Sequence, residues 1–257
     1  MAAMPQPQCM KLFNKLKRKA LHIIFLCLVC ACWSCTHSSN YDVDRAVYPI
    51  KGIDLSAHNG LVDFQKVKDD TVSFVILKAT EGTDFCDAMF AHNYKEARKA
   101  GLKVGAYNFF SFDTPGKMQA QHFISSLSGR VLDFPLVIDV EDWHNAKGVS
   151  ASAVVRQLRQ MIDEIAAMGY RVMIYTNRGG YAKYVKGNFP DAHVWYCTLT
   201  GEPPHGVESW ALWQHTHRGK VAGVEGNVDV NTFNGTQSGF DAFTTLGDTI
   251  PGKPSAY

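Results

Sequence analysis

The sequence predicts a single α/β domain, an irregular (β/α) barrel of eight strands with about five helices. From residue 50 onward, short apolar runs alternate with stretches of helical periodicity, which is typical of a barrel built from parallel strands. A chain of 257 residues with 46% hydrophobic content is long enough for one such core. Several apolar runs end in an acidic or aromatic residue, as strands do where a barrel opens to solvent.

Eight runs have the length, the β-branched or aromatic content and the flanking turn residues of strands. They are residues 50–55, 72–79, 103–110, 135–141, 171–177, 193–199, 210–216 and 227–233. The last three runs follow one another with little helix between them. The expected barrel is therefore irregular rather than a full (βα)8 barrel.

Helical stretches lie between several of these strands. They are residues 63–68, 88–100, 115–127, 152–168 and 181–187. The fourth has the clearest periodicity, and the apolar residues that share one of its faces are Val154, Val155, Leu158, Met161, Ile162 and Ile165. Asp113 and Thr114 are expected to cap the third helix, which has Pro115 in its first turn.

The first 35 residues are predicted to be a targeting segment. A basic run precedes an apolar stretch that is shorter than the roughly 20 residues of a transmembrane helix, as in a signal peptide. Ser34 and Cys35 end this stretch like a lipobox, so we expect Cys35 to be lipidated and the protein to be exported. It would then be a membrane-anchored lipoprotein of the cell envelope, on its periplasmic or surface face. The expected parts are a leader (1–35), a polar tether (36–48), the barrel domain (49–246) and a tail (247–257).

Charge and cysteine content exclude several classes of function. The formal net charge is +2, but the leader holds five basic and no acidic residues, which leaves +2 − 5 = −3 for the rest. That part has no electrostatic footprint for nucleic acid. Beyond the leader only Cys86 and Cys197 remain, without metal-site spacing, and no glycine-rich phosphate cradle occurs. We expect isolated thiols rather than a bridge, no metal, no cofactor, and a monomer.

Acidic residues mark the ends of three predicted strands. Asp139 and Glu141 are two residues apart, so both point to the same side of their strand. Two carboxylates this close do not ionise easily together, and one stays protonated, as general acid catalysis of glycoside hydrolysis requires. Asp54 and Asp229 lie in the first and last strands, which are neighbours in a closed barrel. Each of the four taken alone is more often a solvated acid, a cap or a turn residue.

Aromatic residues occur near the same strand ends. Sugar rings stack on aromatic side chains, so acids together with aromatics indicate a polysaccharide cleft. The candidate substrate-binding residues are Tyr107, Phe109, Trp143, Tyr175, Trp213 and Lys78. The alternative for each aromatic is a place in the core, and for Lys78 a buried stem with an exposed ammonium group.

These residues together resemble the glycoside hydrolase family 25 lysozymes, the Chalaropsis-type muramidases. The resemblance covers about residues 51–234. Its motifs are GIDLS at 52–56, FVILKATEG at 74–82, VGAY at 104–107, DVE at 139–141, IYTN at 174–177, LWQ at 212–214 and GNVDVN at 226–231. Asn108 departs from the pattern, since family members often have His there, and so does the segment 195–198.

The resemblance implies a flattened eight-stranded barrel that hydrolyses the β-1,4 bond between N-acetylmuramic acid and N-acetylglucosamine in peptidoglycan. It implies that Glu141 is the general acid and that Asp139 assists by orienting the 2-acetamido group. Asp54 and Asp229 would complete the acidic cluster. The alternatives are a non-catalytic module that binds peptidoglycan or another amino-sugar polymer, and a glycosidase acting on chitin-like polymers.

Overall fold

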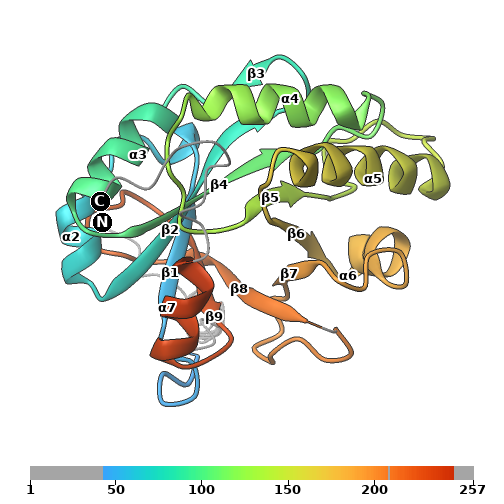
Figure 1. Ribbon diagram of the computed structural model, residues 1–257. Helices are drawn as coiled ribbons and strands as arrows, with labels where there is room; N and C mark the ends of the chain where they lie inside the picture. The colour runs from blue at the N-terminus through green and yellow to red at the C-terminus, as the bar shows by residue number, and fades with distance from the viewer. Residues whose placement is uncertain (1–42, 208, 246–257) are drawn as a thin grey trace, which may run out of the picture. The chain divides into compact units, whose positions relative to one another are not determined.

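The computed structural model describes residues 43–207 and 209–245 (Figure 1). The predicted leader with Cys35 and the predicted tail lie outside this range. The last part of the predicted tether differs from expectation, because it packs on the barrel. Val43 is buried, and the Tyr48 ring lies 6.0 Å from that of Trp213.

The predicted barrel of eight strands is confirmed. The strands are β1 (Lys51–Leu55), β2 (Val72–Glu81), β4 (Lys103–Phe109), β5 (Leu136–Asp139), β6 (Val172–Asn177), β7 (His193–Cys197), β8 (Trp210–Gly219) and β9 (Val228–Phe233). Each pairs with the next in this order, and β9 pairs with β1, which closes the barrel because β1 also pairs with β2. Among these eight strands all pairings are parallel except those of β9, which runs antiparallel to both β8 and β1.

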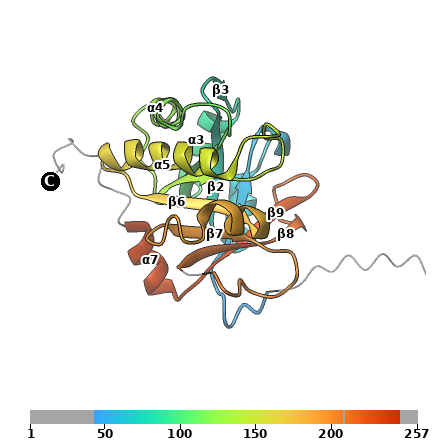
Figure 2. The ribbon, with the colours of Figure 1, turned by 90° about the vertical axis from the view of Figure 1, so that its right-hand side faces the viewer.

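The helices cover the barrel unevenly. They are α2 (Phe64–Asp69), α3 (Phe90–Lys99), α4 (Gly116–Leu127), α5 (Ala151–Ala167), α6 (Arg178–Gly180) and α7 (Gln237–Thr245), with a 3-10 turn at Ala57–Asn59 and a π-helical turn at Tyr181–Val185. Helices α4 and α5 lie side by side over the β4–β6 part of the sheet (Figures 1 and 2). The stretch from β7 to β9 carries no described helix, in agreement with the predicted irregularity.

Alternation along the strands separates two apolar cores. On β2, Val75 and Leu77 belong to the core beneath the helices, whereas Phe74 and Ile76 fill the interior of the barrel. Gly52 on the neighbouring β1 makes room for this filling, since a Cβ there would lie 2.2 Å from the Phe74 ring. The end of the barrel where the parallel strands begin is therefore filled with apolar side chains, and the end where they finish is left for polar side chains.

Two short elements were not expected from the sequence. Strand β3 (Phe85–Cys86) forms a hairpin with the end of β2. Helix α7 places Phe240 and Phe243 against Phe74, Phe134 and Phe233, so it closes the end of the barrel where the parallel strands begin.

The predicted helix starts were partly wrong. Helix α4 begins at Gly116, and Pro115 occupies the cap position without a side-chain hydrogen bond. Asp113 and Thr114 do not cap it, because Gln157 of α5 instead accepts the Gly116 N–H at 3.0 Å. A Cβ at Gly116 would lie 1.8 Å from the Gln157 carbonyl oxygen, so this glycine permits the close approach of α4 and α5.

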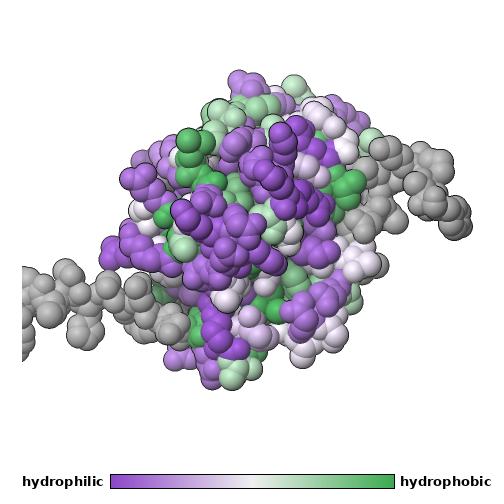
Figure 3. Space-filling view, turned by 90° about the vertical axis from the view of Figure 1, so that its left-hand side faces the viewer, coloured by the Kyte–Doolittle hydropathy of each residue, from purple (hydrophilic) through white to green (hydrophobic). Residues whose placement is uncertain are grey.

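Hydrophilic residues predominate on the face seen in Figure 3, with apolar residues scattered among them. Among residues 43–207 and 209–245, no helix is both long and apolar enough to cross a membrane.

Candidate active site

A cavity of about 590 Å³ opens where the parallel strands end. Its lining residues come from β1, β2, β4–β9 and the segments that follow them. They are Asp54, Ser56, His58, Lys78, Tyr107, Phe109, Asp139, Glu141, Trp143, Tyr175, Asn177, Trp195, Gln214, His217 and Asp229. The four predicted acids and five of the six predicted substrate-binding residues thus share one cavity.

Asp139 and Glu141 line the cavity together, as their spacing predicts. Asp139 is 8% exposed, and its Oδ1 atom has no hydrogen-bond partner among the described residues. Burial raises the pKa of Asp139 well above its ordinary value, and the carboxylates of Glu141 and Asp54 raise it further. Burial also raises the pKa of Glu141, against a hydrogen bond that Asn177 Nδ2 donates to Glu141 Oε1 at 2.8 Å. Both carboxyl groups therefore hold protons more tightly than in water.

Asp54 and Asp229 lie directly opposite each other in the β1–β9 ladder. Burial, and then the carboxylate of Asp229, raises the pKa of Asp54 to about 7. Burial, and then Glu141, raises the pKa of Asp229 to about 6. The expectation that these two acids are neighbours is confirmed, but Asp229 does not stand at the end of its strand as expected. Asp229 is the second residue of β9, and the antiparallel direction of that strand brings it to the cavity.

Asp54 is held by two amide side chains from the neighbouring strands. Its Oδ1 atom accepts from Gln214 Nε2 at 2.9 Å and from Asn231 Nδ2 at 2.7 Å. The Tyr175 hydroxyl donates to Gln214 Oε1 at 2.7 Å, and Trp195 Nε1 donates to Asn231 Oδ1 at 2.8 Å. These second contacts fix the orientation of both amides, so that each presents its NH2 group to Asp54.

Aromatic side chains and one lysine form the cavity wall. Trp143 is 68% exposed, which suits a stacking surface at the rim, whereas Tyr107 and Tyr175 lie deeper. Lys78 pairs with Glu81 at 2.7 Å, lies over the Phe109 ring, and its charge lowers the pKa of Asp139.

Trp213 does not line the cavity, unlike the other predicted residues. It is 2% exposed, and its Nε1 atom donates to the Thr198 carbonyl at 2.9 Å. The β8 side chains next to it, Leu212 and Gln214, point into the barrel instead. The expected contact of Trp213 with a substrate therefore has no support from its position, which is that of a packing residue between β7 and β8.

Several cavity residues were not among the predicted ones. Asn177 and Gln214 fall within quoted motifs, and their positions at strand ends could have identified them. Trp195 lies in the segment 195–198 that departs from the family pattern, and it was not selected. Ser56 also falls within a quoted motif, directly after the first strand, whereas His58 and His217 gave no signal because they lie outside the regular part of a strand.

The remaining sequence features lie away from the cavity lining. Asn108 is buried beneath the helices and donates from Nδ2 to Thr80 Oγ1 at 2.9 Å. Cys86 is exposed and Cys197 is buried, both as free thiols. Across the residues that the structure describes, no group of three His, Cys, Asp or Glu side chains is placed to hold a metal ion.

The sequence of this chain is similar to those of known proteins. The family model described as "Glycosyl hydrolases family 25" matches residues 53–224. A protein from Escherichia coli O157:H7, described as uncharacterized protein YegX, is 33% identical over 204 residues, which are 77% of this chain and 74% of that protein. Lysozyme M1 from Streptomyces globisporus is 34% identical over 206 residues, which are 73% and 68% of the two chains.

A solved structure shows the same fold. The family 25 glycosyl hydrolase from Bacillus anthracis superposes with a TM-score of 0.74 at 32% identity. The match covers 81% of this chain and 99% of that one.

Proposed function

We infer the reaction at this cavity from one premise: the chain belongs to family 25 of the glycosyl hydrolases. It is therefore a glycoside hydrolase. We propose that it is an N-acetylmuramidase, which hydrolyses the β-1,4 bond between N-acetylmuramic acid and N-acetylglucosamine in peptidoglycan. The matching Streptomyces globisporus protein is a lysozyme, which supports this substrate.

Glu141 is the general acid in this proposal. Protonation of a glycosidic oxygen requires a carboxylic acid that keeps its proton near neutral pH, and burial raises the pKa of Glu141 in that direction. Asn177 holds Oε1, and no described residue makes a hydrogen bond to Oε2. The second oxygen is thus left for the leaving group of a bound glycan.

Asp139 assists catalysis by orienting the substrate's 2-acetamido group. Its unpartnered and buried Oδ1 atom is the single observation that carries the proposal, because a buried acceptor without a donor is costly in the free protein. An acetamido N–H supplies that donor. Asp54 and Asp229 complete the acidic cluster, and Tyr107, Phe109, Trp143, Tyr175 and Lys78 form the walls that contact the sugar rings.

A binding module without catalysis would use the same walls. Binding alone gains nothing from two buried carboxyl groups, whose desolvation costs free energy. A chitin-directed glycosidase keeps the acids and differs only in the acceptance of the lactyl group. The competing functions therefore separate on products rather than on binding.

The test is digestion of purified peptidoglycan followed by borohydride reduction and mass spectrometry. Muramitol ends are expected, whereas glucosaminitol ends would show a glucosaminidase, and bound but uncut polymer would show a binding module. Glu141→Gln should lower the rate by about a hundredfold or more and leave the fold intact. Glu202→Gln, at an exposed glutamate outside the cavity lining, is the matched control. A Glu141→Gln rate near that of the control would remove Glu141 from this role.

Action on peptidoglycan requires that the enzyme leave the cytoplasm. We propose export through the amino-terminal leader and anchoring by lipidation of Cys35, with the barrel facing the cell wall. Cys35→Ala should release the protein into the soluble fraction, measured by fractionation and immunoblotting. Continued membrane association of this variant would argue against the anchor.

A further inference from the structure

Strand β8 carries a histidine, His217, that has no role in the proposed reaction. His217 lines the cavity, and its Nε2 atom lies 2.9 Å from Gln214 Oε1 and 3.6 Å from Cys197 Sγ. In a regular strand, residues 214 and 217 would point to opposite faces because their spacing is odd. Both line the same cavity, so the strand must be irregular between them.

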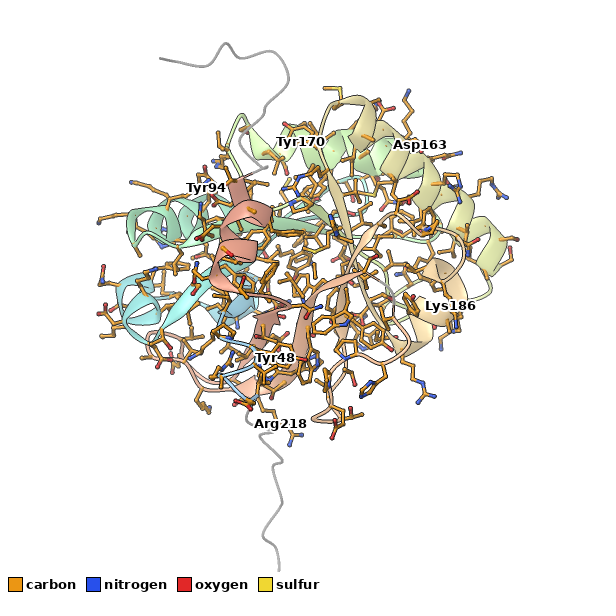
Figure 4. All side chains as sticks on the ribbon, turned by 60° about the horizontal axis from the view of Figure 1, so that its bottom comes forward. Tyr48, Tyr94, Asp163, Tyr170, Lys186 and Arg218 are labelled. Atoms are coloured by element: carbon orange, nitrogen blue, oxygen red, sulfur yellow. The ribbon has the colours of Figure 1, made fainter. Side chains whose placement is uncertain are left out.

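The irregularity is a bulge in the β8–β9 ladder. Gln214 pairs with Asn231 and Thr216 pairs with Val230, so two steps along β8 match one step along β9. Because Val230 belongs to the core outside the barrel, Thr216 shares that outer face and His217 turns inward. Arg218, the next residue, points away from the body of the protein (Figure 4). Bulges are common next to active sites, where they redirect a side chain.

The contact with Gln214 selects a form of the imidazole ring. Gln214 Oε1 is only an acceptor, so His217 must carry a proton on Nε2. Gln214 Oε1 then receives two donors, Tyr175 Oη and His217 Nε2, while its Nε2 donates to Asp54. If His217 were protonated on Nδ1 alone, two acceptors would face each other across 2.9 Å.

The imidazole also faces the acidic cluster. When it is charged, its field lowers the pKa of both Glu141 and Asp54, against the effect of burial. The titratable groups around it are Cys197 on β7, Tyr175 on β6, Glu141 after β5, Asp54 on β1 and Asp229 on β9. Lys78, the lysine of the cavity wall, is paired with Glu81.

We propose that His217 is a positioning residue of the muramidase site. Its Nε2–H holds Gln214, which in turn holds Asp54, and its charge tunes the acidic cluster. This rests on the proposed function for its catalytic consequence, but not for its geometry. His217 does not touch the reacting atoms in this proposal. It acts through Gln214 and through the electrostatic field on Glu141.

The test compares two variants with a matched control. His217→Ala removes both the donor and the charge, and kcat/KM at the optimum should fall by about three- to tenfold. His217→Gln keeps an amide donor, so it should recover most of that loss. In both variants the pH–rate profile should move to higher pH, since loss of the positive charge lets the pKa of Glu141 and Asp54 rise. His92→Gln, at an exposed histidine of α3, should leave the profile unchanged.

A profile that stays in place in both His217 variants would overturn the proposal, because a merely structural role moves stability and not the profile. A second measurement stands apart from catalysis. Long-range 1H–15N spectra, assigned by comparison with His217→Gln, should show neutral His217 protonated on Nε2. Protonation on Nδ1 would overturn the proposal even in a fully active muramidase. An inactive wild-type protein whose His217 ring is protonated on Nε2 would instead refute the proposed function. The hydrogen bond from His217 to Gln214 would still be supported.

Discussion

Replacement of Asp54 by asparagine should make the protein more resistant to the destabilisation that accompanies a rise in pH from 3.8 to about 7. The Asp54 pKa is about 7 in the folded protein and 3.8 ordinarily. Below pH 3.8 the group is protonated in both the folded and the unfolded state, so its effect on stability does not vary with pH. Between pH 3.8 and 7 only the unfolded chain releases the proton, so the free energy of unfolding falls as pH rises. Above pH 7 that loss is complete.

The magnitude follows from the size of the shift. A difference of 3.2 pH units at 1.36 kcal/mol per unit gives a loss of about 4 kcal/mol, of which about 3 kcal/mol falls between pH 4.5 and pH 8. These are upper values because the carboxyl group opens on the cavity. Asparagine keeps the Oδ1 acceptor for Gln214 and Asn231 and carries no charge at any of these pH values.

Urea unfolding at pH 4.5, 6 and 8 checks this prediction, with the fluorescence of the buried Trp195 and Trp213 as the signal. The free energy of unfolding of Asp54→Asn relative to wild type should increase steadily with pH. Asp84→Asn, at an exposed acid before β3, is the control and should run parallel to wild type. Parallel curves for Asp54→Asn as well would show that the buried acids do not oppose folding, and the reasoning would fail.

Two further predictions concern the other acids and the packing beneath them. Asp139→Asn should lower kcat by about a hundredfold while binding to insoluble peptidoglycan stays measurable in a sedimentation assay; lost binding with an intact kcat would assign Asp139 to substrate binding instead. Gly52→Ala would place a Cβ 2.2 Å from the Phe74 ring, so we expect about 1–3 kcal/mol of destabilisation and a lower Tm by calorimetry. An unchanged Tm would mean that the barrel interior rearranges freely.

Regular features of the strands could be predicted from the sequence. The spacing of two predicted that Asp139 and Glu141 would face the same side, and both line the cavity although β5 ends at Asp139; closure of the barrel placed Asp54 beside Asp229. Both arguments use only the geometry of paired strands, which does not depend on distant contacts. Their predicted roles in catalysis stay predictions until the variants are measured.

The antiparallel direction of β9 could have been predicted from the sequence, but it was not. Only eight residues separate β8 from β9, whereas a connection between parallel strands needs about a dozen or more. That length already favours an antiparallel pair. Helix α7 is a different case, since its segment begins Gln-Ser-Gly and has no long apolar stripe. Its place depends on Phe240 and Phe243 meeting the open end of the barrel, and such contacts are invisible in the local pattern.

His217 shows why part of the site was beyond sequence reasoning. A strand pattern assigns faces by counting in twos, and one extra residue in the ladder reverses every later assignment. The bulge at His215 therefore reverses the count between Gln214 and His217, and it turns a residue expected on the outer face into one that lines the cavity. Asp54, Asp139 and Asp229 come from regular ladder positions and Glu141 follows β5 by two residues, whereas this histidine comes from an irregular position. In this barrel, the positions of the acids follow from the strand pattern, while the position of His217, which we propose to tune them, depends on a break in that pattern.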